Sequence, residues 1–132
     1  MQTEEVYLAT CQLPGCDDDY ASMFLCVRHY AQRAKTTLTS QEFIAGFAAQ
    51  QGTCPYCLVS LGTRFEIDHF HGDCTAGHLR NKRMCRECMR GMIHRECNEE
   101  LKWVERAIAA GRGGVLAPHV AAYLATRPYL AA

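Results

Sequence analysis

Apolar side chains recur at helical spacing along several stretches of the chain. The clearest stretch begins after Thr39, which stands three residues before Glu42 as a capping box requires. Phe43 and Phe47 lie on its apolar face, and Gly52 marks its end. Further helices are expected over residues 27–35, 86–95, 98–110 and 118–127.

Residues 61–67 instead begin with a turn at Gly62 and continue as the apolar and polar run of a strand. A second strand is expected over residues 78–84, after a glycine-containing loop at residues 72–77. Residues 1–10 are expected to form an arm or an edge strand. The order strand, loop, strand and helix, with other helices around it, predicts a small α+β domain.

The cysteine content changes this picture, because a chain of 132 residues builds only a marginal hydrophobic core. An odd number of cysteines, nine, and the Cys-x-x-Cys pairs among them favour zinc ligands over disulfides, as does the lack of a signal-peptide pattern. No apolar run approaches the roughly 20 residues that span a membrane. We therefore expect a soluble cytoplasmic protein that is stapled by metal.

Two Cys-x-x-Cys pairs flank the middle of the chain: Cys54 with Cys57, and Cys85 with Cys88. Four thiolates at this spacing match a tetrahedral structural zinc site. One zinc ion on these pairs would fix both ends of the segment between them. The sequence therefore predicts a zinc-stapled core over residues 38–110.

A second set of possible metal ligands precedes this core, within a segment of residues 1–37. Its members are Cys11, Cys16, Cys26 and His29. Their spacing suits zinc, and a Pro-Gly turn lets the first two thiolates face one ion. The alternative is a pair of buried cysteines and an unrelated surface histidine. We favour a second structural zinc, and we expect residues 111–132 to add only a short C-terminal helix.

The pair Asp68 and His69 ends the first predicted strand, between the two Cys-x-x-Cys pairs. Hydrolysis of a phosphodiester needs a base that activates water and a cation that neutralises charge. His69 suits the base, since an ordinary imidazole has a pKa near ~6.5. Asp68 suits Mg²⁺, which usually takes one or two carboxylates and fills its other positions with water and phosphate oxygens. The pair therefore indicates metal-dependent hydrolysis of nucleic acid.

The charges are unevenly distributed, although the formal net charge is zero. Basic side chains dominate residues 78–95, whereas the first twenty residues contain acids and neither lysine nor arginine. A basic run is either a solvated face or a phosphate-binding patch. Its overlap with the candidate catalytic residues favours phosphate, and Arg80 is a candidate for the clamp.

These residues resemble the His-Me finger (HNH) nucleases, most closely the phage recombination endonuclease VII type. The resemblance covers residues 40–105 and rests on both Cys-x-x-Cys pairs and the Asp-His-x-His element that ends at His71. It implies a ββα-metal core with structural zinc on the four cysteines. It also implies that Asp68 is a ligand of Mg²⁺ or Mn²⁺, that His69 is the general base and that His71 orients the phosphate. The implied substrate is branched or otherwise distorted DNA, cut inside a phage-infected cell, and a homodimer would cut two strands symmetrically.

One residue departs from the family pattern. In that family Asn or His directly follows the last zinc cysteine and completes the catalytic metal site, but Met89 follows Cys88 here. A thioether is a poor ligand for Mg²⁺. Either Asp68 and phosphate hold the metal alone, or His94 or Asn81 reaches it, or catalysis is lost. Two pairs could also suit a third metal or be bystanders: Cys74 with His78, and His94 with Cys97.

Two classes of function follow from these residues. The first is a metal-dependent endonuclease that acts on branched or duplex DNA. The second is an inactive zinc-stabilised module that binds DNA or a protein. Retention of Asp68 and His69 favours the first class, and Met89 favours the second. A redox role of the Cys-x-x-Cys pairs is a distant third alternative, because no thioredoxin-like βαβ pattern accompanies them.

Overall fold

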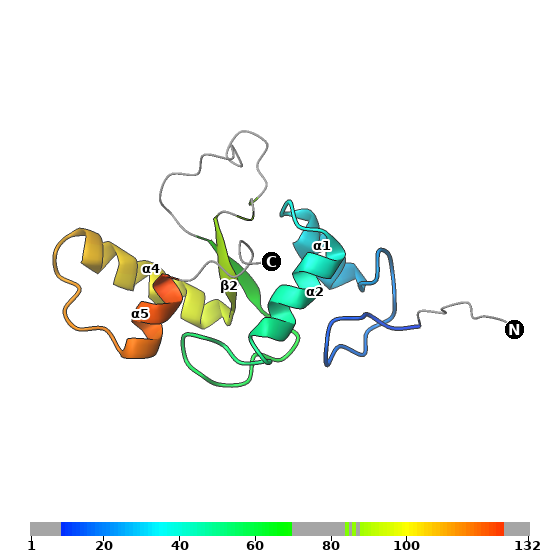
Figure 1. Ribbon diagram of the computed structural model, residues 1–132, viewed down its shortest axis with the longest axis horizontal. Coiled ribbons are helices and arrows are strands. Elements are labelled where there is room, and N and C mark those ends of the chain that lie inside the picture. The colour runs from blue at the N-terminus through cyan, green and yellow to red at the C-terminus, as the bar shows by residue number, and fades with distance from the viewer. Residues whose placement is uncertain (1–8, 70–83, 85, 87, 126–132) are drawn as a thin grey trace, which may run out of the picture.

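A two-stranded antiparallel hairpin lies at the centre of the computed structural model, between two pairs of helices (Figure 1). The structure describes residues 9–69, 84, 86 and 88–125. The elements are α1 (Val27–Ala34), α2 (Ser40–Ala49), β1 (Glu66–His69), β2 (Met89–Ile93), α4 (Arg95–Ala109) and α5 (Pro118–Leu124). The chain is therefore the small α+β domain that the sequence predicts.

Helix α2 begins where the capping pattern places it. The Thr39 hydroxyl accepts a hydrogen bond from the Glu42 backbone N–H at 3.0 Å, and the Glu42 carboxylate accepts one from the Thr39 backbone N–H at 2.9 Å. A cap of this kind contributes about 1 kcal/mol. The buried face of α2 places Phe47 against Phe65, with 5.4 Å between the ring centroids. The capping box therefore fixes where α2 begins, and its apolar face supplies Phe47 to the core.

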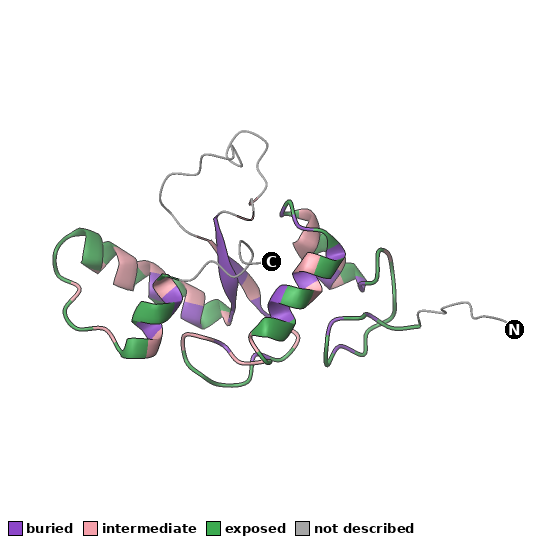
Figure 2. Ribbon diagram, in the orientation of Figure 1, coloured by how far each residue is buried: buried purple, intermediate pink, exposed green. Residues whose placement is uncertain are grey.

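The structure contradicts the helix expected over residues 86–95. Residues Met89–Ile93 form β2, which pairs with β1 so that Glu66 lies opposite Ile93 and Asp68 opposite Gly91. Every residue of β2 is buried (Figure 2). A strand buried on both faces has no alternation of polar and apolar residues, so its sequence resembles that of a buried helix.

The boundaries of the neighbouring elements also differ from expectation. The first strand was expected between a turn at Gly62 and Ile67, whereas β1 comprises Glu66–His69. Helix α4 begins at Arg95 with His94 as its N-cap, so Asn98 lies in the first turn rather than at the cap. Residues 78–83 of the expected second strand lie outside the described residues, as do residues 1–8 and the loop at 72–77.

Gln50 joins α2 to the outer edge of β2. Its Oε1 accepts a hydrogen bond from the Met92 backbone N–H at 2.7 Å, and its Nε2 donates one to the Met92 carbonyl at 2.8 Å. The amide side chain thus satisfies two buried backbone groups, as a third strand would. None of the described helices has the length and apolarity of a membrane span.

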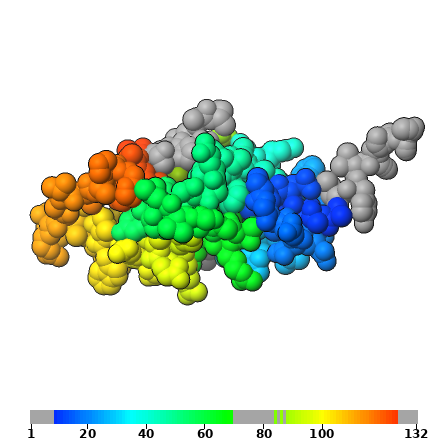
Figure 3. Space-filling model, turned by 90° about the horizontal axis from the view of Figure 1, so that it is seen from below, coloured from blue at the N-terminus to red at the C-terminus, as the bar shows by residue number. Residues whose placement is uncertain are grey.

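The N-terminal segment packs against the chain that leads into β1 (Figure 3). His29 of α1 stacks on Phe65 at a centroid distance of 5.4 Å, and Gln32 donates a hydrogen bond to the Phe65 carbonyl at 2.6 Å. Leu13 and Leu25 of this segment belong to the same buried cluster as the core of the hairpin. The N-terminal segment and the hairpin therefore share one hydrophobic core.

Candidate functional site

The four N-terminal residues expected to bind zinc lie together. Ligand atoms of Cys11, Cys16, Cys26 and His29 all fall within 4.8 Å of one another, and all four residues are buried. A turn at Gly15, whose φ is 84°, brings the first two cysteines to the same side. The other two sit at the N-cap and in the first turn of α1. The cluster could hold a structural zinc ion.

The distances in this cluster suit that metal. His29 Nδ1 lies 3.5 Å from Cys11 Sγ and 3.3 Å from Cys26 Sγ. Tetrahedral zinc with ordinary Zn–S and Zn–N bonds places such atoms about 3.6 Å apart. His29 Nε2 lies 2.8 Å from the Thr63 carbonyl, a contact that places the proton on Nε2 and leaves Nδ1 to face the sulfurs. Burial lowers the pKa of His29, so the imidazole is neutral, as a ligand must be.

A second cluster of three cysteines and one histidine lies beside the hairpin. Its members are Cys54, Cys57, His94 and Cys97, whose ligand atoms also fall within 4.8 Å of one another. His94 Nδ1 lies 3.3 Å from Cys57 Sγ and 3.7 Å from Cys97 Sγ, close to the separation that zinc imposes. His94 Nε2 lies 2.9 Å from the Ser60 carbonyl. This arrangement of the imidazole is the same as that of His29 in the first cluster.

The second cluster corrects the ligand set expected from sequence. Among the described residues, Cys54 and Cys57 lie with His94 and Cys97, and Cys88 is not part of this cluster. Cys88 is buried directly before β2 and belongs to neither cluster, while Cys85 lies outside the described residues. The reason is topological. Cys88 directly precedes β2 and His94 directly follows it, so the length of the strand separates Cys88 from the Cys54 loop that His94 reaches.

Burial and hydrogen bonds shift the pKa values of the cluster thiols in different directions. Burial would raise the pKa of Cys54, but backbone N–H groups of Cys57, His94 and Tyr56 outweigh burial and lower it. Donors directed at one sulfur favour the thiolate. Burial raises the pKa values of Cys16 and Cys97 to about 12, so without metal these thiols keep their protons. Zinc would displace those protons when it binds.

The short loop that contains Ser60 and Thr63 connects the two clusters. Its Thr63 carbonyl contacts the His29 imidazole at 2.8 Å, and its Ser60 carbonyl contacts the His94 imidazole at 2.9 Å. Hydrogen bonds of this kind orient a metal-binding histidine and are part of the site. The loop therefore couples the geometry of one cluster to that of the other.

Asp68 is buried in a network of hydrogen bonds. Its Oδ2 accepts hydrogen bonds from Arg90 Nε at 2.9 Å and from the Tyr123 hydroxyl at 2.7 Å, and its Oδ1 accepts one from Arg90 Nη2 at 3.3 Å. Arg90 also donates to Glu105 Oε2 at 2.8 Å and to the His69 carbonyl at 3.2 Å. Asp68 thus joins β1 to β2, α4 and α5, a set of contacts that the sequence does not predict.

A β-bulge accounts for the position of Arg90. Asp68 pairs with Gly91 and His69 pairs with Met89, so Arg90 is the extra residue of β2. Bulges turn a side chain out of the regular alternation and are common beside active sites. Burial would lower the pKa of Arg90, but Glu105 and Asp68 outweigh burial and raise it. Arg90 therefore remains charged although only 1% of it is exposed.

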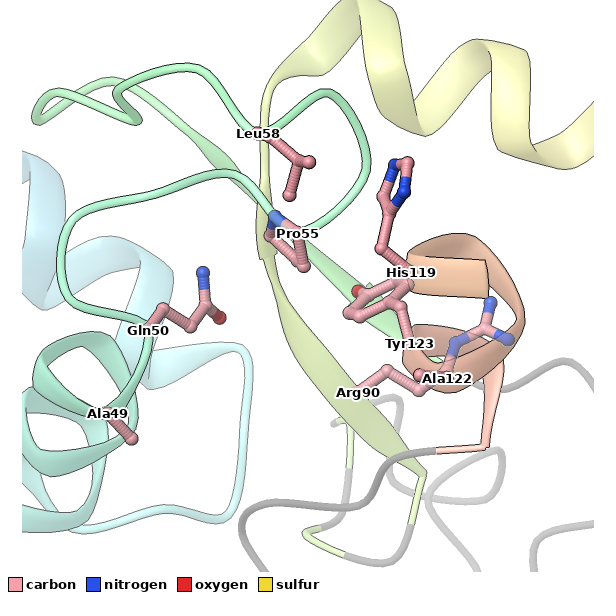
Figure 4. A pocket seen from close by; sticks show the side chains of 8 residues that line it. All are labelled: Ala49, Gln50, Pro55, Leu58, Arg90, His119, Ala122 and Tyr123. Atoms are coloured by element: carbon pink, nitrogen blue, oxygen red, sulfur yellow. The ribbon is translucent and has the colours of Figure 1, made fainter. Parts of the chain in front are cut away.

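Tyr123 closes this network from α5. Burial raises the pKa of Tyr123, so the hydroxyl stays protonated and donates to Asp68. Figure 4 shows Tyr123 and Arg90 at one wall of a cavity of about 360 Å³, with Gln50 and Pro55 across it. Asp68 is 2% exposed, so this cavity reaches its partners and not its carboxylate.

The remaining candidate residues are only partly described. His69 ends β1 and is half-buried. His71 and Arg80 lie outside the described residues, as do Cys74, His78 and Asn81. Met89 is fully buried at the start of β2, where it belongs to the hydrophobic core. Its thioether thus has a packing role.

The sequence did contain a signal for the second cluster. His94 and Cys97 repeat, in reverse order, the spacing of Cys26 and His29 in the first cluster. Two residues at this spacing can supply half of a zinc site. His94 and Cys97 were therefore an alternative to Cys85 and Cys88 as the ligands that complete the site of Cys54 and Cys57.

Comparison of the chain with protein-family models, with curated proteins and with solved structures found no match. What the chain does must therefore be inferred from its own residues.

Proposed function

We propose that the chain is a DNA endonuclease of the His-Me finger kind, which hydrolyses phosphodiester bonds with His69 as general base. The observation that carries this proposal is the hairpin and helix unit closed by the second cluster. Cys54 and Cys57 precede β1, His94 and Cys97 lie at the start of α4, and His69 ends β1 between them in sequence. A zinc ion there would hold the strand that carries His69 against a fixed frame.

The residue that follows Cys97 also supports the proposal. With Cys97 as the last zinc ligand, the residue that follows is Asn98, and not Met89. Asn is one of the two residues that the His-Me finger pattern has at this place. Asn98 lies in the first turn of α4 and donates a hydrogen bond to Glu66 Oε1 at 2.9 Å. An Asn at this place supports the proposal, because Met89 is then no longer the residue that follows the last zinc ligand.

A Mg²⁺ site on Asp68 does not fit the described arrangement. Both carboxylate oxygens of Asp68 accept hydrogen bonds from Arg90, and one of them accepts a further bond from Tyr123. Among the described residues, the metal-type clusters contain only cysteine and histidine. We therefore assign no catalytic step to Mg²⁺, and we treat Asp68 as a residue that positions β2, α4 and α5 around His69.

Cleavage of DNA by zinc-loaded protein tests the proposal. Supercoiled plasmid and a four-way junction are incubated with the protein in Mg²⁺, in Mn²⁺ or without added divalent metal. We expect cutting by the native chain and a loss of about 100-fold or more in His69→Ala, since a general base contributes factors of this order. His119→Ala is the matched control, because His119 lies on α5, where its Nε2 contacts the Tyr56 carbonyl at 2.9 Å. Native protein that leaves both substrates intact in all three conditions would refute the proposal.

A zinc-stabilised module that binds DNA or protein without cutting is the second candidate. The observation in its favour is the burial of Asp68, which the family pattern assigns to a metal. The same incubation separates the two functions. A gel shift of the junction without any cleavage, in protein that retains two zinc ions, would establish the binding module.

A further inference from the structure

A hollow of about 440 Å³ is bordered by residues of α1 and of the second Cys/His cluster. Three arginines line it, each from a different segment: Arg28 from α1, Arg64 from the chain before β1 and Arg95 from the first turn of α4. His94 of the second cluster lines it as well, together with Glu66 and Glu96. Because three separate segments contribute one guanidinium each, the positive charge of the hollow is a product of the fold.

Each of these arginines is attached to the framework that holds a cluster. Arg28 directly precedes His29, and Arg95 directly follows His94. Arg64 directly follows Thr63, whose carbonyl contacts the His29 imidazole at 2.8 Å. Zinc bound at the two clusters would therefore fix the backbone of all three arginines.

The described ion pairs around the hollow involve Arg28 and Arg95 but not Arg64. Glu66 accepts a hydrogen bond from Asn98 at 2.9 Å and lies 3.8 Å from Arg95 Nε. Arg28 contacts Asp18 at 3.2 Å through Nη1 alone. Within the residues that the structure describes, Arg64 forms no ion pair. Three guanidinium groups and two carboxylates line the hollow, and the Asp18 carboxylate pairs with Arg28 from outside the lining, so Arg64 is the arginine that remains for a ligand.

We propose that this hollow binds a phosphate of the DNA backbone, so that the two zinc centres together build one anchoring site for the substrate. The proposal rests on the action on DNA proposed above. Arginine is suited to this role, because its planar group donates two parallel hydrogen bonds to a phosphate. The N-terminal segment thereby acquires a function in substrate binding, in addition to its place in the core.

Binding of the zinc-loaded full chain to a fluorescein-labelled four-way junction, measured by anisotropy at several salt concentrations, tests the site. We expect Arg64→Ala and Arg95→Ala each to weaken binding about three- to tenfold, a loss reduced by solvent exposure. Each substitution should also lower the slope of log K against log salt by about 1, and the double variant should lower it by about 2. Arg64→Lys, which keeps the charge and loses the planar group, should fall between Arg64→Ala and the native chain.

The matched control is Arg112→Ala. Arg112 is exposed and lies beyond the end of α4, away from the residues that line the hollow. It carries the same charge, so its removal tests whether any lost arginine weakens binding. Its affinity and salt slope should remain those of the native chain.

A gain in affinity provides a test that misfolding cannot imitate. Glu96→Gln removes an exposed carboxylate from the lining of the hollow and preserves the shape of the side chain. We expect this variant to bind the junction about two- to fivefold more tightly, since a like charge beside a phosphate is removed. Zinc content of all variants is measured in parallel and should stay at two per chain.

Three outcomes separate this inference from the proposed function. If the native chain cuts DNA and the arginine variants bind like the Arg112→Ala control, the hollow is not the anchoring site, and the nuclease proposal stands. If binding depends on the arginines and no DNA is ever cut, the hollow stands and the nuclease proposal falls. If the native chain does not bind the junction, both are overturned.

Discussion

Removal of one hydroxyl tests the buried network around Asp68. Tyr123→Phe deletes the donor that lies 2.7 Å from Asp68 Oδ2 and leaves the ring in its packed position. A hydrogen bond to a charged group contributes about 1.5–3 kcal/mol, and Asp68 has no access to water that would replace the donor. We expect a loss of about 2 kcal/mol in the free energy of unfolding, or roughly 8 °C in Tm for a chain of this size.

Unfolding in guanidinium chloride with excess zinc, monitored by circular dichroism, measures this loss of stability. Tyr20→Phe is the control, because Tyr20 is 38% exposed and lies on the N-terminal segment rather than on α5. Its stability should stay within about 0.5 kcal/mol of the native value. If Tyr123→Phe is as stable as this control, the hydrogen bond does not stabilise the fold, and the structural role assigned to Asp68 is wrong.

The pH dependence of the same variant gives an independent check. Burial raises the pKa of Tyr123 above its ordinary value of about 10. Above pH ~10 the unfolded chain therefore loses a proton that the folded chain keeps, which favours unfolding. The advantage of the native chain over Tyr123→Phe should be full below pH ~10 and should shrink by about 1.4 kcal/mol per pH unit above it. An advantage that is constant up to pH 11 would contradict the assignment.

Three further outcomes follow from local contacts. Gln50→Ala removes the hydrogen-bond partner of the Met92 N–H and C=O groups and should lower the free energy of unfolding by about 2–4 kcal/mol. Gln41→Ala, on the exposed face of α2, should lower it by less than about 0.5 kcal/mol. The double substitution Met23→Asn and Phe24→Gly should stabilise the chain by about 1 kcal/mol, measured by thermal unfolding. The native residues have φ of 50° and 73° in a tight turn, a conformation that Asn and Gly adopt more easily. Removal of zinc by a chelator should abolish the thermal transition, and re-addition of zinc should restore it.

Local signals in the sequence predicted much of the fold. The capping box at Thr39 placed α2 correctly, and Pro118 placed the start of α5. The first metal cluster was predictable because its four ligands are close in sequence and a turn at Gly15 separates the first two. In each case the interacting groups lie within a few residues of one another, or within one short segment.

The features that sequence reasoning missed depend on contacts between distant residues. Residues Met89–Ile93 form a strand because Glu66–His69 offer a partner, and no signal within residues 89–93 reveals that partner. Cys57 meets His94 across 37 positions, and the nearer Cys-x-x-Cys pair was the simpler partner. Tyr123 reaches Asp68 across 55 positions, so the burial of the carboxylate could not be anticipated.

The zinc content of two cysteine variants tests most directly the claim that two Cys/His clusters build this protein. The native chain should bind two zinc ions, and X-ray absorption should give an average of three sulfur ligands and one nitrogen ligand per zinc. Cys97→Ser should lose or weaken one zinc, whereas Cys88→Ser should keep both, because only Cys97 belongs to a cluster. Loss of zinc from Cys88→Ser, with both ions retained in Cys97→Ser, would contradict the second cluster and the function built on it.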